Sequence, residues 1–269
     1  MKYRLLAIDL DDTFVRDDLS LSQANIDAVI KAQELGVKVV IATGRPTSAT
    51  ADIAQAIKLK EFGGYTITYN GGIIRRESDG KLIREMTITR GEVAALKSLA
   101  DAFHLYIQTY SDSAIITPKD NQYTQIESRI TGLPVEDVGT DFMKVIGDEV
   151  IKVIILEDPI YLKECSDRIY PIVKNQLSMN FSKPFFLEFM NIHVDKKKSI
   201  EYLLEMLNLD HTDLMAIGDS YNDLEMIRFA RCGVAMGNAN DDIKSVADYV
   251  TLDNMHDGVA HAVEKFILQ

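Results

Sequence analysis

Three carboxylates follow an apolar run near the start of the chain: Asp9, Asp11 and Asp12 come directly after residues 5–8. Unperturbed Asp has a pKa of about 3.9, so three neighbouring anions repel one another unless a cation or hydrogen bonds compensate. A hard divalent cation such as Mg²⁺, which prefers oxygen ligands, is the natural compensation. Along an extended chain Asp9 and Asp11 would face the same way and Asp12 the other. The spacing therefore indicates chemistry at Asp9 and Asp11, with Asp12 as a turn or surface acid.

Polar residues also stand at the ends of two further apolar runs. Thr43 follows residues 37–42, and Asp219 follows residues 214–218, with Asp223 shortly after. In open parallel sheets ligands bind beyond the carboxyl ends of the strands, where such side chains would meet. Taken alone, each residue is better interpreted as an ordinary helix cap or turn residue. Their coincidence predicts one site, in which Asp219 or Asp223 adds a carboxylate for the cation.

The elements that must position these residues alternate in type through the first and last thirds of the chain, as expected for βα units and a parallel sheet. Strands are expected at residues 5–8, 37–42, 65–69 and 214–218 and near Val234 and Val250, and a hairpin at 73–83. Ser22 can cap the N-terminus of one helix, and Gly36 stands where that helix should end. Pro46 is well placed in the first turn of another helix. Further helices are expected at 199–207 and 224–230. The first and last thirds should therefore form one sheet.

Between residues 84 and 190 the order changes. Helices are expected at 92–103, 123–130 and 161–177, with strands at 105–117 and 150–156 and further strand signals up to residue 190. This stretch is too long for a structureless loop and has the size of a domain. We therefore predict a core of residues 1–83 and 191–269, interrupted by an inserted α+β domain at 84–190.

The composition of the chain disfavours some classes of binding partner. The 269 residues carry a formal net charge of −12, which opposes binding to DNA or RNA but not to a small phosphorylated ligand held by a local cluster of donors. Apolar runs fall short of the roughly 20 residues of a membrane span, and the N-terminus does not resemble a signal peptide. Cys165 and Cys232 are best read as free thiols in a reducing compartment. We expect a cytoplasmic protein without a nucleic-acid, membrane or obligate protein partner.

Four segments, in chain order, resemble the motifs of the haloacid dehalogenase superfamily. They are Asp9-Leu10-Asp11-Asp12-Thr13, Thr43-Gly44-Arg45, a lysine near position 196, and Gly218-Asp219-Ser220-Tyr221-Asn222-Asp223. Three more segments resemble the Cof-type subfamily of sugar-phosphate phosphatases: Asn70-Gly71-Gly72, residues 233–239 and Asp257-Gly258-Val259. The resemblance implies an α/β fold with a Rossmann-like parallel-sheet core and an inserted cap. It also implies a Mg²⁺-dependent phosphomonoester hydrolase acting on a sugar phosphate or other small metabolite.

The resemblance also implies roles for the acidic residues. Asp9 would attack phosphorus and form an aspartyl-phosphate, and Asp11 would give a proton to the leaving alcohol and later take one from water. Asp9, Asp219 and the backbone carbonyl of Asp11 would hold the metal, and Asp223 would hold metal-bound water.

Other residues would bind the phosphoryl oxygens. These are Thr43, Lys196, Asn222 and the amides of Leu10 and Gly44. Lys196 is preferred over Lys197 and Lys198, which are expected at a solvated helix start. Arg45 is read as a surface residue rather than a phosphate contact, and residues 70–72 as either a tight turn or a substrate loop.

Two other functions remain open. A phosphosugar mutase would use the same Asp pair but return phosphate to a sugar. A non-catalytic phospho-acceptor or phosphate-binding signalling module, similar to a response-regulator receiver, would also combine carboxylates, Thr, Lys and Mg²⁺. A receiver would place its acceptor and acidic pair on separate strands of a shorter domain, whereas Asp9 belongs to the first acidic cluster.

Overall fold

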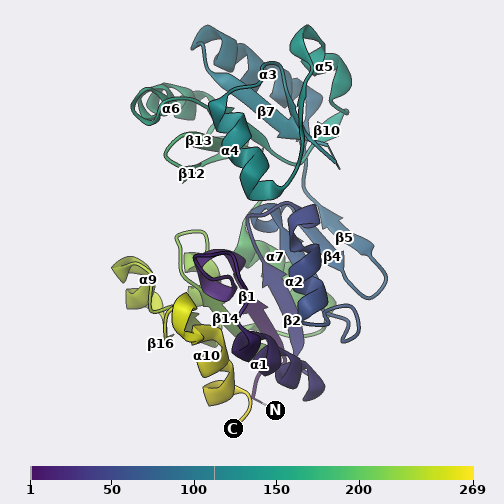
Figure 1. The fold of residues 1–269 in the computed structure, drawn as a ribbon, viewed down its shortest axis with the longest axis vertical. Helices are drawn as coiled ribbons and strands as arrows, with labels where there is room; N and C mark the ends of the chain where they lie inside the picture. Colours follow the sequence, from purple (N-terminus) through teal and green to yellow (C-terminus); the bar gives the residue numbers. More distant parts are fainter. Residues whose placement is uncertain (1, 112) are drawn as a thin grey trace. The chain divides into compact units, whose positions relative to one another are not determined.

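The structure, a computed structural model, describes residues 2–111 and 113–269. These residues divide into two compact units: unit 1 is Met1–Arg84 with Asp195–Gln269, and unit 2 is Glu85–Val194 (Figure 1). The first predicted boundary differs by one residue, 83 against 84, and the second by four, 191 against 195. A separate role for the inserted unit stays a prediction.

The sheet of unit 1 combines strands from both ends of the sequence. Its order is β16 (Tyr249–Val250), β15 (Cys232–Ala235), β14 (Leu214–Gly218), β1 (Leu5–Ile8), β2 (Lys38–Ala42), β3 (Tyr65–Thr68), β4 (Ile73–Arg76) and β5 (Lys81–Glu85). Strand β1 pairs in parallel with both β14 and β2, so that Ile8 lies opposite Ile217 and Ile41. The prediction that the first and last thirds form one sheet is confirmed. Only the β3–β4 hairpin is antiparallel among the pairings described for this sheet.

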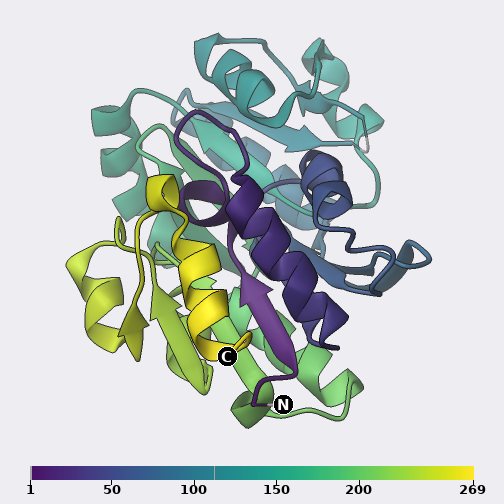
Figure 2. The same ribbon diagram turned by 60° about the horizontal axis from the view of Figure 1, so that its bottom comes forward.

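Side chains alternate across this sheet, because successive residues of a strand point to opposite faces. Leu6 and Ile8 belong to a core with α1 (Gln23–Glu34), α2 (Ala51–Ala56) and α10 (Gly258–Phe266). Leu5 and Ala7 belong to a second core with α7 (Lys196–Met206), α8 (Leu224–Phe229) and α9 (Asp241–Val246). Figure 2 shows α1 and α10 side by side, over one face of the sheet at β1. Apolar side chains thus cover the central strands on both faces, as in doubly wound α/β proteins.

Local sequence explains several element ends. The Ser22 side chain accepts a hydrogen bond from the backbone N–H of Asn25, which caps α1, and Gly36 follows the helix at a φ of 90°. Asp195 accepts from the N–H of Lys198 and caps α7. Helix α7 therefore begins at Lys196, three residues before the predicted start at 199. Pro46 precedes a short helical turn (η2, Thr47–Thr50) that leads into α2.

Unit 2 is an inserted α+β unit, as predicted. Its larger sheet has the order β12 (Leu177–Lys183), β13 (Phe186–Asn191), β11 (Val153–Leu156), β7 (Tyr106–Tyr110), β8 (Ile115–Thr117) and β9 (Val135–Asp137), and β10 (Glu149–Val150) pairs with β6 (Ile88–Thr89). The helices of this unit are α3 (Arg90–Ala102), α4 (Gln122–Thr131), α5 (Phe142–Val145) and α6 (Pro159–Val173). Residues from α3 and α6 pack with β7, β11 and β13 in the main core of the unit.

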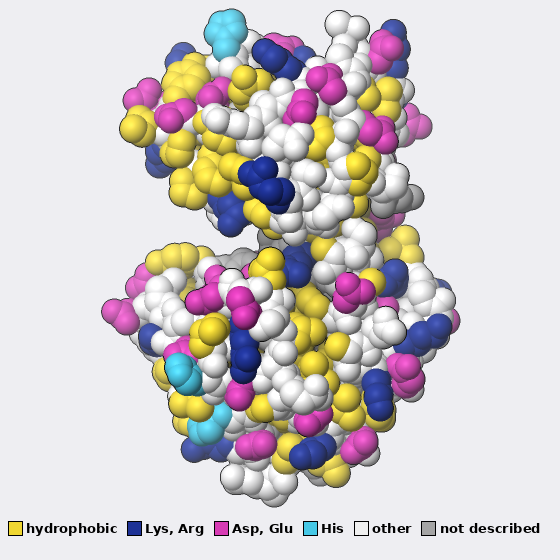
Figure 3. All heavy atoms as spheres, viewed as in Figure 1, with side chains coloured by type: hydrophobic (Ala, Val, Ile, Leu, Met, Phe, Trp, Pro, Cys, Tyr) yellow, Lys and Arg dark blue, Asp and Glu magenta, His cyan; other side chains and the backbone are white. Residues whose placement is uncertain are grey.

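Acidic and basic side chains are interspersed on the face shown in Figure 3. A large basic patch, the usual footprint of a nucleic-acid site, is not seen on this face. Within residues 2–111 and 113–269, we find no helix with the length and apolarity that crossing a membrane requires.

Candidate active site

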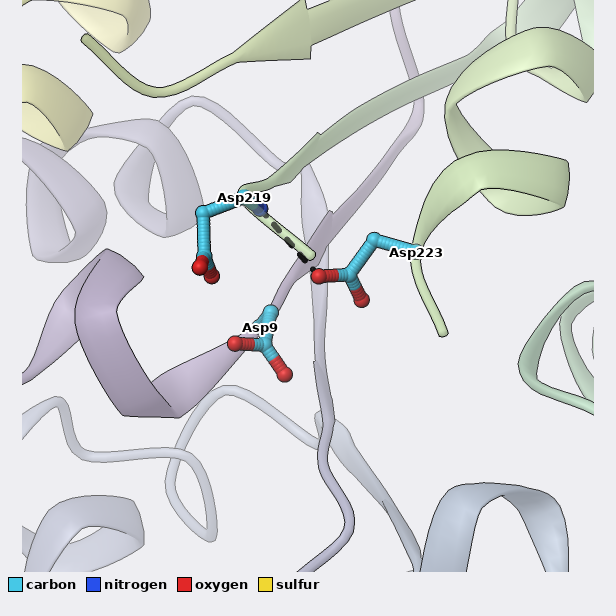
Figure 4. A group of neighbouring side chains, drawn as sticks. All are labelled: Asp9, Asp219 and Asp223. Carbon is cyan, nitrogen blue, oxygen red and sulfur yellow. Dashed lines mark hydrogen bonds between the residues drawn. The ribbon is translucent and has the colours of Figure 1, made fainter. Parts of the chain in front are cut away.

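Asp9, Asp219 and Asp223 converge at the carboxyl end of the central strands. Asp9 follows β1, Asp219 follows β14, and Asp223 precedes α8. One carboxylate oxygen from each lies within 4.8 Å of the other two, and Figure 4 shows the three carboxylates directed toward a common space. Asp9 is 4% exposed and Asp223 fully buried. Because the donors are all carboxylate oxygens, the group suits a hard cation such as Mg²⁺.

Lys196, the first residue of α7, is the cation that meets this cluster. Its Nζ donates to Oδ1 of Asp9 over 2.6 Å and to Oδ1 of Asp223 over 2.7 Å, and the residue is 2% exposed. The next lysine, Lys197, forms an ion pair with Glu201 on the helix surface, and Lys198 is exposed. The structure therefore brings Lys196 into the site and keeps its two neighbours outside.

The cluster holds more negative charge than Lys196 balances. Burial, and then the nearby carboxylate of Asp223, raise the pKa of Asp9 well above its ordinary value. Burial and Asp223 also raise the pKa of Asp219, to about 7. Burial opposes the charge of Lys196, but Asp223 and Asp9 outweigh it and raise the pKa of the ammonium. An added cation would relieve this repulsion, which supports the fit of the site to a metal.

Neighbouring groups fix the orientation of Asp219 and Asp223. Oδ2 of Asp223 accepts from the backbone N–H groups of Asp219, over 3.2 Å, and Ser220, over 3.1 Å. The Thr13 hydroxyl donates to Oδ1 of Asp219 over 2.8 Å. A Cβ at Gly218 would lie 2.6 Å from both Cβ and Cγ of Asp223, so only glycine leaves room for this carboxylate. The glycine that ends β14 is thus part of the architecture of the site.

Asp11 lies outside the carboxylate cluster and pairs with Arg45. Arg45 donates from Nε to Oδ1 and Oδ2 of Asp11, over 3.1 and 3.0 Å, and from Nη2 to Oδ1, over 2.6 Å. The Arg45 side chain is 19% exposed and that of Asp11 55%. The interpretation of Arg45 as merely a surface residue is wrong, because its guanidinium fork engages an acid of the first motif.

The backbone after β1 explains the position of Asp11. Residues Leu10–Phe14 form a wide turn (η1), in which the N–H of Val15 donates to the carbonyl oxygen of Leu10 over 2.9 Å and Asp12 adopts a φ of 57°. The assumption of an extended chain across Asp9–Asp12 is therefore wrong. The structure does not group the carboxylate of Asp11 with those of Asp9, Asp219 and Asp223. A metal-binding role for the Asp11 carbonyl stays a prediction.

The candidate phosphate-binding residues lie on neighbouring elements. Leu10 follows Asp9 directly and is buried, and Thr43 follows β2 and is buried, where its hydroxyl accepts from the N–H of Arg45 over 3.1 Å. Asn222 donates to the side chain of Asn70 over 3.1 Å, and a Cβ on Gly44 would lie 3.2 Å from the same Asn70 oxygen. The structure thus brings Gly44, Asn70 and Asn222 together; that they bind phosphate stays a prediction.

Residues 70–72 form a tight turn, in which Asn70 lies beside Gly44 and contacts Asn222. Asn70 has a φ of 55°, and the Gly71 carbonyl accepts from the Ser199 hydroxyl over 3.0 Å. A Cβ at Gly71 would lie 2.6 Å from the carbonyl oxygen of Asp195, so glycine allows the turn to approach the start of α7. This close approach places the turn beside the helix that carries Lys196.

Three of these partners, Thr13, Arg45 and Asn70, are not among the site residues that the sequence predicts. Thr13 ends the first motif, and Arg45 ends the second, so their positions were a usable signal. Asn70 lies in a segment that the sequence assigns to a turn or a substrate loop. What the sequence lacked was the pairing, because each contact joins residues from distant segments.

Similarity to known proteins identifies the family of the chain. The family described as haloacid dehalogenase-like hydrolases matches residues 6–263. The chain belongs to this family. A solved structure of a haloacid dehalogenase-like hydrolase from Bacteroides thetaiotaomicron is 35% identical, with a TM-score of 0.93 over 98% of this chain and 99% of that one. The resemblance inferred from the motifs and the predicted fold class are both confirmed.

Two curated relatives are similar to this chain along nearly their whole length. The 5-amino-6-(5-phospho-D-ribitylamino)uracil phosphatase YcsE of Bacillus subtilis (strain 168) is 30% identical, over 98% of this chain and 96% of that protein. The phosphoglycolate phosphatase of Methanobrevibacter smithii (strain ATCC 35061) is also 30% identical, over 100% of both. The prediction of an enzyme, a phosphatase of the haloacid dehalogenase type, is confirmed.

Proposed function

We propose that this chain hydrolyses a phosphomonoester of a small metabolite, such as a sugar phosphate, through an aspartyl-phosphate on Asp9. The observation that carries the proposal is the meeting of Asp9 with Lys196, Asp219 and Asp223 at the end of β1. A buried carboxylate beside a lysine and further metal-type ligands is the arrangement that attack on phosphate requires. The names of the two curated relatives, which specify different small phosphorylated compounds, support the substrate class.

In the first step, an Asp9 carboxylate oxygen forms a bond to phosphorus, and the bond between phosphorus and the ester oxygen breaks. Asp11 gives its proton to the leaving alkoxide, which departs as an alcohol. In the second step, water attacks the phosphorus of the aspartyl-phosphate, and Asp11 takes up a proton from this water. The bond between phosphorus and the Asp9 oxygen breaks, which releases inorganic phosphate and restores both carboxyl groups.

Asp9, Asp219 and Asp223 would hold Mg²⁺, because their carboxylate oxygens form the described group suited to a metal. When bound, the cation supplies positive charge that lowers the repulsion between Asp9 and an anionic phosphate. Lys196 supplies further positive charge at the same carboxylate. Thr43, Asn222 and the amides of Leu10 and Gly44 bind the phosphoryl oxygens in this proposal. A cytoplasmic location and recognition of the substrate by unit 2 are part of the same proposal.

The test is a phosphatase screen across sugar phosphates, nucleotides and 4-nitrophenyl phosphate, with Mg²⁺ and with chelator. We expect turnover that needs the metal and that Asp9→Asn abolishes. Asp167→Asn is the matched control, because it makes the same chemical change on the surface of α6, where Asp167 pairs only with Lys163 among the contacts described. Full activity of Asp9→Asn would reject the covalent mechanism. Release of an isomeric phosphosugar without inorganic phosphate would indicate a mutase instead.

A further inference from the structure

The loop that follows the acidic turn is held by side chains from the C-terminal part of unit 1. This loop, Asp12–Ser22, doubles back on itself: Val15 and Leu21 form an antiparallel bridge, and the N–H of Arg16 donates to the carbonyl oxygen of Ser20 over 3.1 Å. The start of this loop overlaps η1 (Leu10–Phe14), which carries Asp11 and Thr13. A contact that holds the backbone at the start of the loop therefore also restrains the backbone from which these two side chains extend.

Asn238 makes the first link. Its Nδ2 donates to the carbonyl oxygen of Asp12 over 2.7 Å, and its Oδ1 accepts from the backbone N–H of Asn254 over 3.1 Å. A carbonyl oxygen can only accept and a backbone N–H can only donate, so the orientation of the Asn238 amide is fixed by its partners. An amide side chain satisfies both partners at once, whereas a carboxylate can satisfy only the N–H.

Asn254 makes the second link. It is 3% exposed, and its Nδ2 donates to the carbonyl oxygen of Val15 over 3.3 Å and to Oδ1 of Asp17 over 2.8 Å. The carbonyls of Asp12 and Val15 flank Thr13, whose hydroxyl donates to Asp219. The two asparagines thus hold the backbone on both sides of a residue that contacts the carboxylate cluster.

The backbone of Asp12 gives this support a physical reason. Asp12 has a φ of 57°, a left-handed conformation that costs a residue with a side chain free energy and persists where the surroundings hold it. Asn238 binds the carbonyl group of this same residue. Without that bond, the peptide between Asp12 and Thr13 is freer to rotate, and Asp11 on one side and Thr13 on the other move with it.

We propose that Asn238, supported by Asn254, is a positioning residue that holds the acidic turn so that Asp11 is placed for proton transfer. The inference rests on the proposed function, because it assigns Asp11 the role of acid and base. It accounts for two parts of the sequence that the proposed chemistry does not use, the segment 233–239 and the residues just before Asp257. These segments act on the reaction through the backbone of η1 rather than through the substrate.

The test compares Asn238→Asp with Asn240→Asp. Asn238→Asp keeps the acceptor for the N–H of Asn254 and removes the donor to Asp12. Asn240 lies two residues away and caps α9 by accepting from the N–H of Ile243, a role that Asp fills equally well. Both variants add one negative charge to the same loop. A difference between their activities therefore reports the loss of the hydrogen bond from Asn238 to the carbonyl oxygen of Asp12.

Two aryl phosphates separate positioning from a general loss of active protein. Phenyl phosphate has a more basic leaving group than 4-nitrophenyl phosphate, so its cleavage depends more on a proton from Asp11. We expect Asn238→Asp to lower kcat/KM for phenyl phosphate about tenfold more than for 4-nitrophenyl phosphate, and Asn240→Asp to change neither. Asn238→Ala, which removes both bonds of an exposed side chain, should show the same selective loss with little change in the midpoint of thermal unfolding.

The outcomes distinguish the inference from the function on which it rests. Equal losses with the two substrates, or no loss in either Asn238 variant, would overturn the positioning role while Mg²⁺-dependent turnover by the wild type still supports the phosphatase proposal. Absence of turnover by the wild type, or full activity of Asp9→Asn, would reject the proposed mechanism and the inference with it.

Discussion

The ammonium of Lys196 donates to the carboxylate of Asp9 over 2.6 Å, at a site where both side chains are almost fully buried. A second buried carboxylate, that of Asp223, accepts from the same nitrogen over 2.7 Å. Lys196 therefore neutralises part of the negative charge that β1 and the start of α8 bring together. It also fixes the proposed nucleophile by a direct hydrogen bond.

Replacing Lys196 tests both consequences of this contact. We expect Lys196→Met to lower kcat by at least about 10²-fold, since an electrostatic contact to the reacting group is lost. The metal-free protein should also lose about 3–5 kcal/mol of unfolding free energy, because the change leaves buried carboxylates unpaired. Steady-state kinetics and urea unfolding measure the two effects. Lys197→Met, which removes the ion pair with Glu201 and the contact of the ammonium with the Phe229 ring but no contact to the carboxylate cluster, should stay near the wild type. Equal effects of the two variants would argue against the assignment.

Arg45 should affect the rate more than the stability. Its fork holds both oxygens of Asp11, but the Asp11 side chain is 55% exposed, so the pair should contribute less than about 1 kcal/mol to stability. We expect Arg45→Gln to lower kcat about tenfold or more, because the proposed acid and base loses its partner. Arg45→Lys should restore little of this loss, since lysine cannot reproduce the two-pronged contact. Kinetics and thermal unfolding of both variants test this expectation, and a wild-type kcat in Arg45→Gln would contradict it.

The stability of the metal-free protein should fall as the pH rises from about 4 to 7. The pKa of Asp219 is raised to about 7 and that of Asp9 is also raised, so the folded state binds more protons than the unfolded state in this range. The stabilisation is fully present below the unfolded pKa of about 4 and is lost as the pH passes the folded pKa. Each unit of pKa difference corresponds to about 1.4 kcal/mol, so the total is a few kcal/mol.

Thermal unfolding in chelator at several pH values measures this slope. Asp219→Asn should flatten it, because the variant cannot take up the proton. Mg²⁺ should raise the unfolding midpoint more at pH 8 than at pH 5, since the cation competes with protons for the same oxygens. A metal effect that is the same at both pH values would contradict binding at this cluster.

Gly218 should be sensitive to the smallest possible addition. A Cβ at this position would lie 2.6 Å from two carbons of Asp223, closer than real Cβ contacts, so Gly218→Ala must displace that carboxylate. We expect a loss of activity of about tenfold or more and a loss of stability of about 1–3 kcal/mol from overpacking. The control is Gly91→Ala, because Gly91 lies in α3 and its added Cβ would have no neighbour nearer than 3.8 Å. Normal activity in the Gly218→Ala variant would mean that Asp223 can move without consequence.

The sequence indicated the parts of the site that local patterns carry. Apolar runs followed by polar residues indicate a site at Asp9, Thr43 and Asp219, because parallel strands place their carboxyl ends along one edge. The β14 strand was predicted at its observed bounds, 214–218. Predicting these strands and the residues that follow them requires only the local pattern of apolar residues and the position at which it ends.

Features that depend on contacts between distant segments were not predictable in the same way. The turn of η1 rests on a positive φ at Asp12, and a single sequence does not show that Asn238, 226 positions away, supports it. Helix α7 begins before the apolar period that predicts it, because a run of three lysines carries no such period. The cap by Asp195 adds a turn before Ser199. The role of Arg45 is not visible in the sequence for a similar reason, since its partner Asp11 follows a different strand.

Because β1 lies between β2 and β14, the centre of the sheet cannot be completed until β14 has been synthesised. Asp9 leaves the ribosome 187 positions before Lys196, and β14 follows later still. Until β14 arrives, one edge of β1 has no strand to pair with, and joining the two requires closure of a long loop, which slows folding. The nascent chain therefore contains its proposed nucleophile long before it has an active site. Premature termination before β14 should leave an unpaired, apolar strand edge that is prone to aggregation rather than a partly active enzyme.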